Sequence, residues 1–312
     1  MKKNINLALL QMSCSDDVQE NFNKTVDYIR QAASRGAHIV CTQELFQSRY
    51  FCQVMDVELF KLAQAVDENS ATVRALRELA AELEIVIIAS LFEKRATGIY
   101  HNTAIVIDAD GRHLGKYRKM HIPNDPLYFE KFYFTPGDLG YKVFRTKYAD
   151  IGVLICWDQW FPEAARLTAM QGAEIIFYPT AIGNVLPAGT GVQGDGYFDS
   201  WQTVQRGHAI ANACYVAAAN RVGFEENPSP LFGTGPVGES GIDFWGGSFV
   251  ASPYGDVLQT AGSDDEQILV CPVDLSFVAK VRDGELFPFR DRRVDSYGGL
   301  TRLYLDEDSS TR

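Results

Sequence analysis

The sequence predicts a single-domain α/β fold in which the second half repeats the arrangement of the first. Short apolar runs alternate with amphipathic helical segments throughout the 312 residues, a pattern typical of α/β proteins. Residues 36–40 (GAHIV) and 172–176 (GAEII) both join a helical segment to an apolar run, about half the chain apart. No linker rich in Ser, Gly or Pro divides the chain. We therefore expect one domain over residues 1–312, with a flexible tail at 306–312.

In the first half, five apolar runs have the length of buried strands and two segments have helical spacing. The strands are expected at 5–11, 38–42, 85–90, 103–107 and 113–117. The first helix, beginning at Val18, repeats apolar residues every three or four positions, which places them on one face. Gly36 can end this helix, and Ser70 can cap the second helix.

The second half has the same alternation of strands and helices. Helices are expected at 162–172, where Pro162 suits the first helical position, and at 199–213. The strands are expected at 151–155, 174–178, 215–219, 248–252, 257–259 and 267–272. Segments 183–196 and 223–247 are rich in glycine and are predicted to be long loops, which are often functional in a compact domain.

The composition is that of a packed globular protein with an acidic surface. Hydrophobic residues make up 46% of the chain, and 29 Lys and Arg against 40 Asp and Glu give a net charge of −11. The acidity argues against nucleic acid as a partner, because phosphate binding needs clustered Lys and Arg. It permits a cationic small molecule. The N-terminus has no signal-peptide pattern and no apolar run reaches membrane-helix length, so we expect a cytoplasmic protein without a membrane partner.

The cysteine, histidine and glycine patterns indicate neither a metal site nor a dinucleotide site. None of the six cysteines forms a C-x-x-C pair, so we expect reduced thiols rather than disulfides or zinc ligands. The five histidines show no ligand spacing. The pattern G-x-G-x-x-G occurs at 189–194 and 233–238, but neither copy follows a strand and opens a helix, as a dinucleotide site requires.

Cys156 lies where a reactive residue of an α/β protein is expected. It closes the apolar run 151–155, and ligands of α/β sheets bind beyond the carboxyl ends of strands. From position alone, a buried inert thiol is the alternative. A thiol nucleophile needs a base and a positive neighbour. Glu44, just past another predicted strand, can act as the base, and Lys119 can supply the charge.

Three blocks of sequence then carry a family resemblance. Residues 42–46 (TQELF), 115–123 (GKYRKMHIP) and 155–158 (ICWD) resemble, in this order, the signature blocks of the nitrilase (carbon–nitrogen hydrolase) superfamily. Residues 128–138 resemble the region of its second conserved glutamate. Within the superfamily, the stretches that are most similar to amidases acting on N-carbamoylputrescine are 50–53, 125–134 and 156–166.

The resemblance implies a four-layer αββα sandwich that works without a cofactor. It assigns Glu44 as general base, Lys119 as electrophilic stabiliser and Cys156 as nucleophile. Glu130 would orient Lys119 and the substrate, and the backbone N–H of Trp157 would help to hold the oxyanion. The resemblance also implies a homodimer or a larger homo-oligomer.

The reaction implied is cleavage of N-carbamoylputrescine to putrescine, ammonia and carbon dioxide through a carbamoyl thioester, a step of polyamine biosynthesis. A cationic ureido substrate needs aromatic walls for its methylenes and a carboxylate for its ammonium. Tyr50 is the predicted wall. The candidate carboxylates are Asp125, Asp195 and Asp199.

Two alternatives stay open at the level of sequence. An N-carbamoyl amino acid hydrolase or an omega-amidase would use the same chemistry, and an arginine to grip a substrate carboxylate can be sought among Arg49, Arg145 and Arg206. A catalytically silent binding protein could use the same fold. The presence of Glu44, Lys119, Glu130 and Cys156 together argues against the silent protein.

Overall fold

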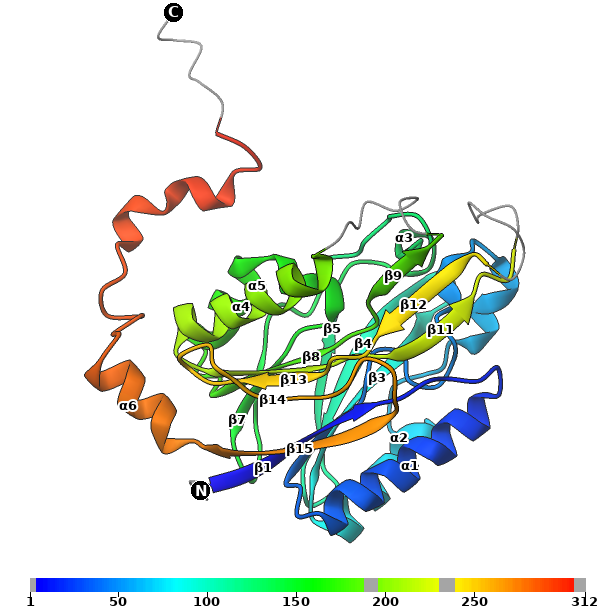
Figure 1. Ribbon diagram of the computed structural model, residues 1–312, viewed down its shortest axis with the longest axis horizontal. Coiled ribbons are helices and arrows are strands. Elements are labelled where there is room, and N and C mark those ends of the chain that lie inside the picture. The colour runs from blue at the N-terminus through cyan, green and yellow to red at the C-terminus, as the bar shows by residue number, and fades with distance from the viewer. Residues whose placement is uncertain (1–3, 188–195, 230–238, 306–312) are drawn as a thin grey trace, which may run out of the picture.

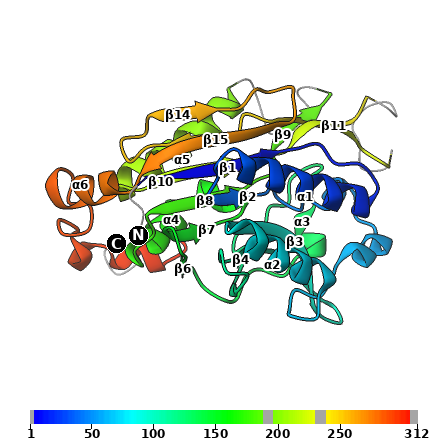
Figure 2. The ribbon, with the colours of Figure 1, turned by 90° about the horizontal axis from the view of Figure 1, so that it is seen from below.

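The computed structural model describes residues 4–187, 196–229 and 239–305, and it is built on two stacked six-stranded sheets with helices outside them (Figures 1 and 2). The layers run helix, sheet, sheet, helix. The expected four-layer αββα sandwich is therefore confirmed. The tail predicted at 306–312 lies outside the described residues.

The first sheet contains the N-terminal strands and one strand from the end of the chain. Its order is β15 (Gln267–Asp274), β1 (Asn4–Gln11), β2 (Ile39–Cys41), β3 (Val86–Ala96), β4 (Ile99–Ile107) and β5 (His113–Arg118). The three strands β1, β2 and β3 are parallel. The outer strands are antiparallel to their neighbours.

The second sheet repeats this arrangement. Its order is β6 (Val143–Arg145), β7 (Asp150–Val153), β8 (Ile175–Pro179), β10 (Tyr215–Ala219), β13 (Phe249–Ala251) and β14 (Val257–Thr260). Again the three strands β7, β8 and β10 are parallel, and the outer strands are antiparallel. The duplication predicted from residues 36–40 and 172–176 is confirmed, since both segments lie at the start of the second parallel strand of their sheet.

Two helices flank each sheet. The first sheet carries α1 (Val18–Ser34) and α2 (Ala71–Leu83), and the second carries α4 (Pro162–Met170) and α5 (Tyr197–Asn212). The side chain of Asp17 caps α1 and that of Ser70 caps α2. Gly36 follows α1 with φ +83°, a left-handed conformation that glycine adopts without steric cost.

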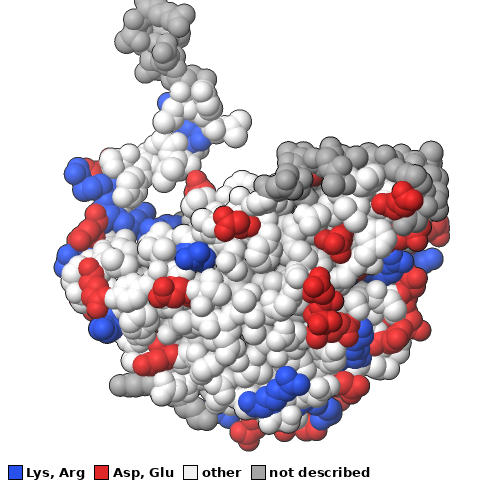
Figure 3. Space-filling view, viewed as in Figure 1, with Lys and Arg blue, Asp and Glu red and all other residues white. Residues whose placement is uncertain are grey.

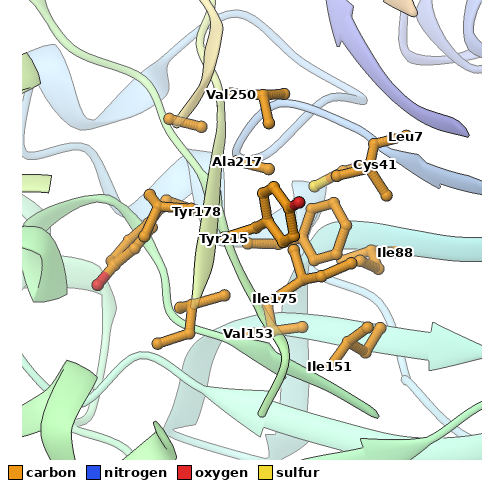
Figure 4. Packing of buried hydrophobic residues seen from close by; sticks show 14 of the residues in the cluster. Leu7, Cys41, Ile88, Ile151, Val153, Ile175, Tyr178, Tyr215, Ala217 and Val250 are labelled. Atoms are coloured by element: carbon orange, nitrogen blue, oxygen red, sulfur yellow. The ribbon is translucent and has the colours of Figure 1, made fainter. Parts of the chain in front are cut away.

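The strands bury both of their faces because they lie between two layers. In β1, Leu7 and Leu9 face the second sheet, whereas Ala8 and Leu10 face α1 and α2, the alternation that a strand imposes. Figure 4 shows side chains of both sheets meeting between them, and the labelled residues that meet there include Leu7, Cys41, Ile88, Ile175 and Tyr215.

The two segments predicted as long loops contain strands, so this prediction is partly wrong. A three-stranded antiparallel sheet forms from β9 (Gly183–Leu186), β12 (Gly241–Trp245) and β11 (Val222–Glu226). Each strand is short and begins or ends near glycine. Strands β9 and β12 pair across 55–61 residues, and β11 and β12 across 15–23 residues, so local periodicity does not reveal them.

The chain leaves the sandwich after β15 through α6 (Ser276–Gly284). Residues 285–305 then extend away from the body and include two short 3-10 helices (Figure 1). We call residues 285–305 the C-terminal arm. Among the helices that the structure describes, none is both long and apolar enough to cross a membrane.

Candidate active site

The predicted catalytic residues follow strand ends in both sheets. Glu44 lies just after β2 and Lys119 directly follows β5, both in the first sheet. Cys156 lies just after β7 of the second sheet, and Glu130 begins the short helix α3 (Glu130–Tyr133). The stacking of the sheets brings these ends together, and all four side chains are buried.

Lys119 joins two carboxylates at the centre of the site. Its Nζ lies 2.8 Å from Oε1 of Glu44 and 2.6 Å from Oε2 of Glu130. The hydroxyl of Tyr50 donates to the other oxygen of Glu130 at 2.7 Å. The amide of Asn102 donates to Oε1 of Glu44 at 2.7 Å. The ammonium is therefore held between the two glutamates, each fixed by a second donor.

One carboxylate oxygen of Glu44 has no hydrogen-bond partner in the part of the chain that the structure describes. Oε2 of Glu44 is buried and has no hydrogen-bond partner among the described residues, whereas Oε1 accepts from Lys119 and Asn102. An unpaired carboxylate oxygen is unfavourable in a buried environment. An oxygen that is free to accept a proton is what a general base requires, and the charge of Glu44 acts on the Cys156 thiol.

The turn that carries Cys156 has a strained backbone. Cys156 has φ +43°, a region that non-glycine residues rarely occupy and that is common at functional sites. The residue begins a 3-10 helix, Cys156–Trp160, so the predicted oxyanion donor Trp157 is its second residue. The thiol lies 3.9 Å from the carbonyl oxygen of Ala181.

Asp158 ties this turn to the segment that carries Lys119. Its buried carboxylate accepts from the backbone N–H of Ile155 at 2.9 Å and from the hydroxyl of Tyr117 at 2.8 Å. The backbone N–H of His121 donates to the same carboxylate at 3.0 Å. The nucleophile turn and the lysine segment are therefore fixed relative to each other.

Burial and neighbouring charges shift the pKa values of the cluster. Burial would lower the pKa of Lys119, but the carboxylates of Glu130 and Glu44 outweigh it and raise that pKa well above its usual range. Burial raises the pKa of Glu130, and because the ammonium of Lys119 offsets this only in part, that pKa stays raised at about 7. Burial and the charge of Glu44 raise the pKa of the Cys156 thiol well above its usual range. The thiol therefore needs a base to become a nucleophile.

The residues predicted to bind substrate lie in different environments. Tyr50 is fully buried and its hydroxyl donates to Glu130, so its observed contact is with the predicted catalytic cluster. Asp125 is half-buried in a backbone bridge with Tyr128. Asp199 is exposed in the first turn of α5. Asp195 lies outside the described residues. The role of each in substrate binding stays a prediction.

The three arginines considered for a substrate carboxylate have other partners. Arg145 pairs with Asp150 at the edge of the second sheet. Arg206 donates to the carbonyl of Gly255, and Arg49 donates to that of Glu226. The described residues contain no group of three His, Cys, Asp or Glu side chains that could hold a metal. Both G-x-G-x-x-G segments, 189–194 and 233–238, lie outside the described residues.

Sequence reasoning missed three buried residues that support the site. Asn102 binds Glu44, and the pair Arg221 and Glu225 binds the backbone of the segment after Glu44. Asn102 lies directly before the strand expected at 103–107, and Arg221 and Glu225 lie just before and just inside the segment 223–247 predicted as a loop. Charged residues in such positions are usually solvated, so only their burial reveals them.

Comparison with known proteins agrees with this geometry. A family model described as carbon-nitrogen hydrolase matches residues 6–283. The chain belongs to this family. It is 45% identical over 309 residues to the N-carbamoylputrescine amidase of Oryza sativa subsp. japonica, covering 98% of this chain and 97% of that relative. It is 41% identical over 305 residues to the citrullinase of Francisella tularensis, covering 96% and 99% respectively.

The fold is also that of a solved member of the family. The crystal structure of a carbon-nitrogen hydrolase from Helicobacter pylori G27 matches with a TM-score of 0.88 and 41% identity, covering 97% of this chain and 100% of that chain. The similarity extends beyond the site to nearly the whole molecule, including both sheets and their flanking helices.

Proposed function

We propose that this carbon–nitrogen hydrolase cleaves N-carbamoylputrescine to putrescine, ammonia and carbon dioxide. The observation that carries the catalytic part is the buried oxygen Oε2 of Glu44, unpaired among the described residues, in a cluster that also holds Lys119 and Cys156. The substrate is supported by the similarity to an N-carbamoylputrescine amidase over nearly the whole chain.

The first half-reaction forms a thioester. Glu44 takes the proton of the Cys156 thiol, and the thiolate attacks the ureido carbon. The oxyanion is held by Lys119 and the backbone N–H of Trp157; removing one such donor typically lowers the rate by about 10²–10³. Glu44 then gives its proton to the departing ammonia. The C–N bond to that nitrogen breaks, which leaves an N-alkylcarbamoyl thioester on Cys156.

The second half-reaction uses water. Glu44 takes a proton from water, and the hydroxide attacks the thioester carbon. The C–S bond breaks, and the thiolate recovers its proton. The product is an N-alkylcarbamic acid, which decomposes to the amine and carbon dioxide. The overall reaction consumes one water and needs no oxidant or reductant.

Citrulline is the second candidate substrate, because a relative with 41% identity is a citrullinase. Both compounds end in a ureido group, so the chemistry at Cys156 is the same for both. They differ at the other end, which is an ammonium in N-carbamoylputrescine and an amino acid in citrulline. A pocket carboxylate would favour the first compound, and an arginine the second.

Ammonia release from a matched panel of substrates tests the proposal. We expect kcat/KM to be highest for N-carbamoylputrescine, lower for citrulline and N-carbamoyl amino acids, and lowest for omega-amides. The variant Cys156→Ala serves as the chemical control and should show no turnover. Equal or higher kcat/KM for citrulline would contradict the substrate assignment. Absence of turnover with every compound would favour a silent binding protein.

N-Butylurea isolates the contribution of the substrate ammonium, since it has the same ureido group and carbon chain without the amine. We propose that Asp125, Asp195 or Asp199 holds this ammonium. Loss of a charged hydrogen bond typically costs about 1.5–3 kcal/mol, so the responsible Asp→Asn variant should raise KM for N-carbamoylputrescine about 10- to 100-fold. KM for N-butylurea should not change. If none of the three variants separates the two substrates, the anchor lies elsewhere.

We further propose that the protein forms a homodimer or a larger homo-oligomer in the cytoplasm. Exposed apolar side chains are frequent both on the C-terminal arm and on α4 and α5, where they include Leu167, Met170 and Ile210. Two such surfaces on one chain can cover each other in a pair of copies related by a twofold axis. The reactive thiol also favours a reducing compartment.

A further inference from the structure

We propose that the buried ion pair of Arg221 and Glu225 is a positioning device for the catalytic base. Arg221 follows β10 and Glu225 lies on β11, in the small third sheet. Both side chains are buried, and Nη1 of Arg221 lies 2.6 Å from Oε1 of Glu225. The pair contacts neither Lys119 nor Cys156 by any hydrogen bond within the described structure, so any effect on catalysis is indirect. The inference rests on the proposed function.

Arg221 holds the backbone directly after the base. Its Nη2 donates to the carbonyl oxygens of Glu44 at 3.0 Å and Leu45 at 3.1 Å. Its Nη1 donates to the carbonyl of Ser48 at 3.0 Å. Leu45 has φ +51°, which is unfavourable for a side chain of this type. The guanidinium therefore stabilises a strained turn that directs the Glu44 side chain into the site.

Glu225 holds the other end of the same segment. Its Oε2 accepts from the backbone N–H of Tyr50 at 2.6 Å. Its carbonyl oxygen accepts from the side-chain amide of Gln53 at 3.1 Å. The ion pair thus fixes residues 44–53 at several points, although these residues are more than 170 positions away in sequence.

Residues 44–53 contact both sides of the Lys119 ammonium, one side directly and the other through Glu130. Glu44 binds Lys119 directly, and Tyr50 binds Glu130, the second carboxylate on that lysine. A shift of the segment would move both at once. A buried ion pair often contributes little net stability compared with apolar residues of the same volume. A planar fork is also better suited than an ammonium to reach several acceptors. We infer that the pair serves geometry rather than stability.

The first test is Arg221→Lys, which keeps the charge but cannot bridge three carbonyls and a carboxylate. A misplacement of about 1 Å can lower a rate by about 10²-fold. We expect kcat to fall by about that factor, with KM changed by less than about threefold, since none of the three candidate carboxylates for the substrate ammonium lies in residues 44–53. The matched control is Glu266→Gln, which removes a carboxylate bound to Lys24, Ser13 and Tyr28 but not to residues 44–53. Its kcat should stay at the wild-type value.

The double variant Arg221→Met/Glu225→Leu separates positioning from folding. It replaces both buried charges by apolar side chains, a change that often leaves the stability of a protein unchanged or raises it. Its kcat per folded molecule should be as low as that of Arg221→Lys. Wild-type kcat and KM in either folded variant would overturn the inference, as would a loss of activity that only follows the unfolded fraction. Both variants therefore give a result that decides the question.

Alkylation of Cys156 by iodoacetamide provides a readout independent of the substrate. The reaction requires the thiolate, whose formation depends on the placement of Glu44. Peptide mass spectrometry should show slower alkylation at Cys156 in both Arg221 variants and an unchanged rate in Glu266→Gln. If wild-type protein does not cleave N-carbamoylputrescine, the proposed function fails, but this comparison still decides the positioning role. An equal alkylation rate in all variants would overturn that role.

Discussion

At the scale of single residues, the site depends on a lysine buried between two glutamates. Two carboxylates and one ammonium in a water-excluded space would be unfavourable without further donors. Asn102 and Tyr50 supply those donors, one to each glutamate. In the proposed mechanism, the remaining oxygen of Glu44 exchanges a proton with Cys156.

Tyr50→Phe tests whether the buried hydroxyl acts on Glu130 or whether the ring serves as a wall for substrate. Burial raises the pKa of Glu130, and the Tyr50 hydroxyl is one of the groups that lower it again, which leaves it at about 7. Removal of this hydroxyl should raise that pKa further. The acid limb of the kcat/KM profile, where Glu130 becomes protonated, should therefore move to higher pH. An unchanged acid limb with a higher KM would favour the predicted wall instead.

Tyr133→Phe is the matched control for this experiment. It also removes a buried tyrosine hydroxyl, but one that donates to the carbonyl of Val54 at 2.7 Å rather than to a carboxylate. We expect it to leave the acid limb where the wild-type protein has it. A shift in both variants would indicate a general effect on packing.

At the scale of elements, a buried carboxylate fixes the strand that leads to Lys119. The carboxylate of Glu93 on β3 accepts from Nε and Nη2 of the Arg118 guanidinium, each at 2.8 Å. Thr103 of β4 and Lys116 of β5 donate to the same carboxylate at 2.6 Å each. The end of β5 is thus fixed to two neighbouring strands directly before Lys119.

Glu93 also links stability to pH. Burial would raise its pKa, but the hydrogen bonds from Arg118, Lys116 and Thr103 lower it from 4.5 to about 2. A lowered carboxyl pKa gives stability that is present above about pH 4.5 and is lost as pH falls towards about 2. At about 1.4 kcal/mol per pKa unit, this amounts to at most about 3.5 kcal/mol.

Glu93→Gln should therefore unfold more easily at neutral pH and lose less stability on acidification. Urea unfolding between about pH 6 and pH 3 measures both effects. The control Glu82→Gln removes an exposed ion pair with Arg30, which should have little effect on stability. Parallel stability curves for wild type and Glu93→Gln would contradict the assignment.

At the scale of the whole molecule, the two similar sheets of the chain stack and bring the site residues together where their strands end. The C-terminal arm extends away from this body. The arm exposes Val294, Leu300 and Tyr304 to 67%, 66% and 75%. Lys and Arg side chains gather near its base, whereas acidic side chains are spread over the rest of the visible face (Figure 3). An exposed apolar arm on an acidic body suits contact with a second copy of the chain.

Leu300→Asp/Leu303→Asp tests the role of the arm in assembly. Two charges on the apolar arm should shift sedimentation from the dimer, or a larger assembly, towards the monomer. Val57→Asp is the control, because Val57 is equally exposed, at 67%, but lies in a short 3-10 helix outside the arm. Identical sedimentation of wild type and the double variant would contradict a role for the arm in assembly.

The sequence by itself determined the features that depend on short-range order. Strand alternation, helical faces and the cap at Ser70 report on local backbone geometry. With the repeat at 36–40 and 172–176 they predicted the α/β class and the internal duplication, whereas the four layers were predicted from the family resemblance. The residues Glu44, Lys119, Glu130 and Cys156 were found because they lie within family motifs. Their grouping in one cluster agrees with that assignment.

Only the tertiary structure decided which distant residues support this cluster. The third sheet, the contact of Asn102 with Glu44 and the ion pair of Arg221 with Glu225 all join segments far apart in sequence. No local pattern encodes such pairings, because they arise when the sheets stack and exclude water from polar groups that would otherwise be solvated. Asn, Arg and Glu usually lie on protein surfaces; because these ones are buried, they hold Glu44 and the segment that follows it in place.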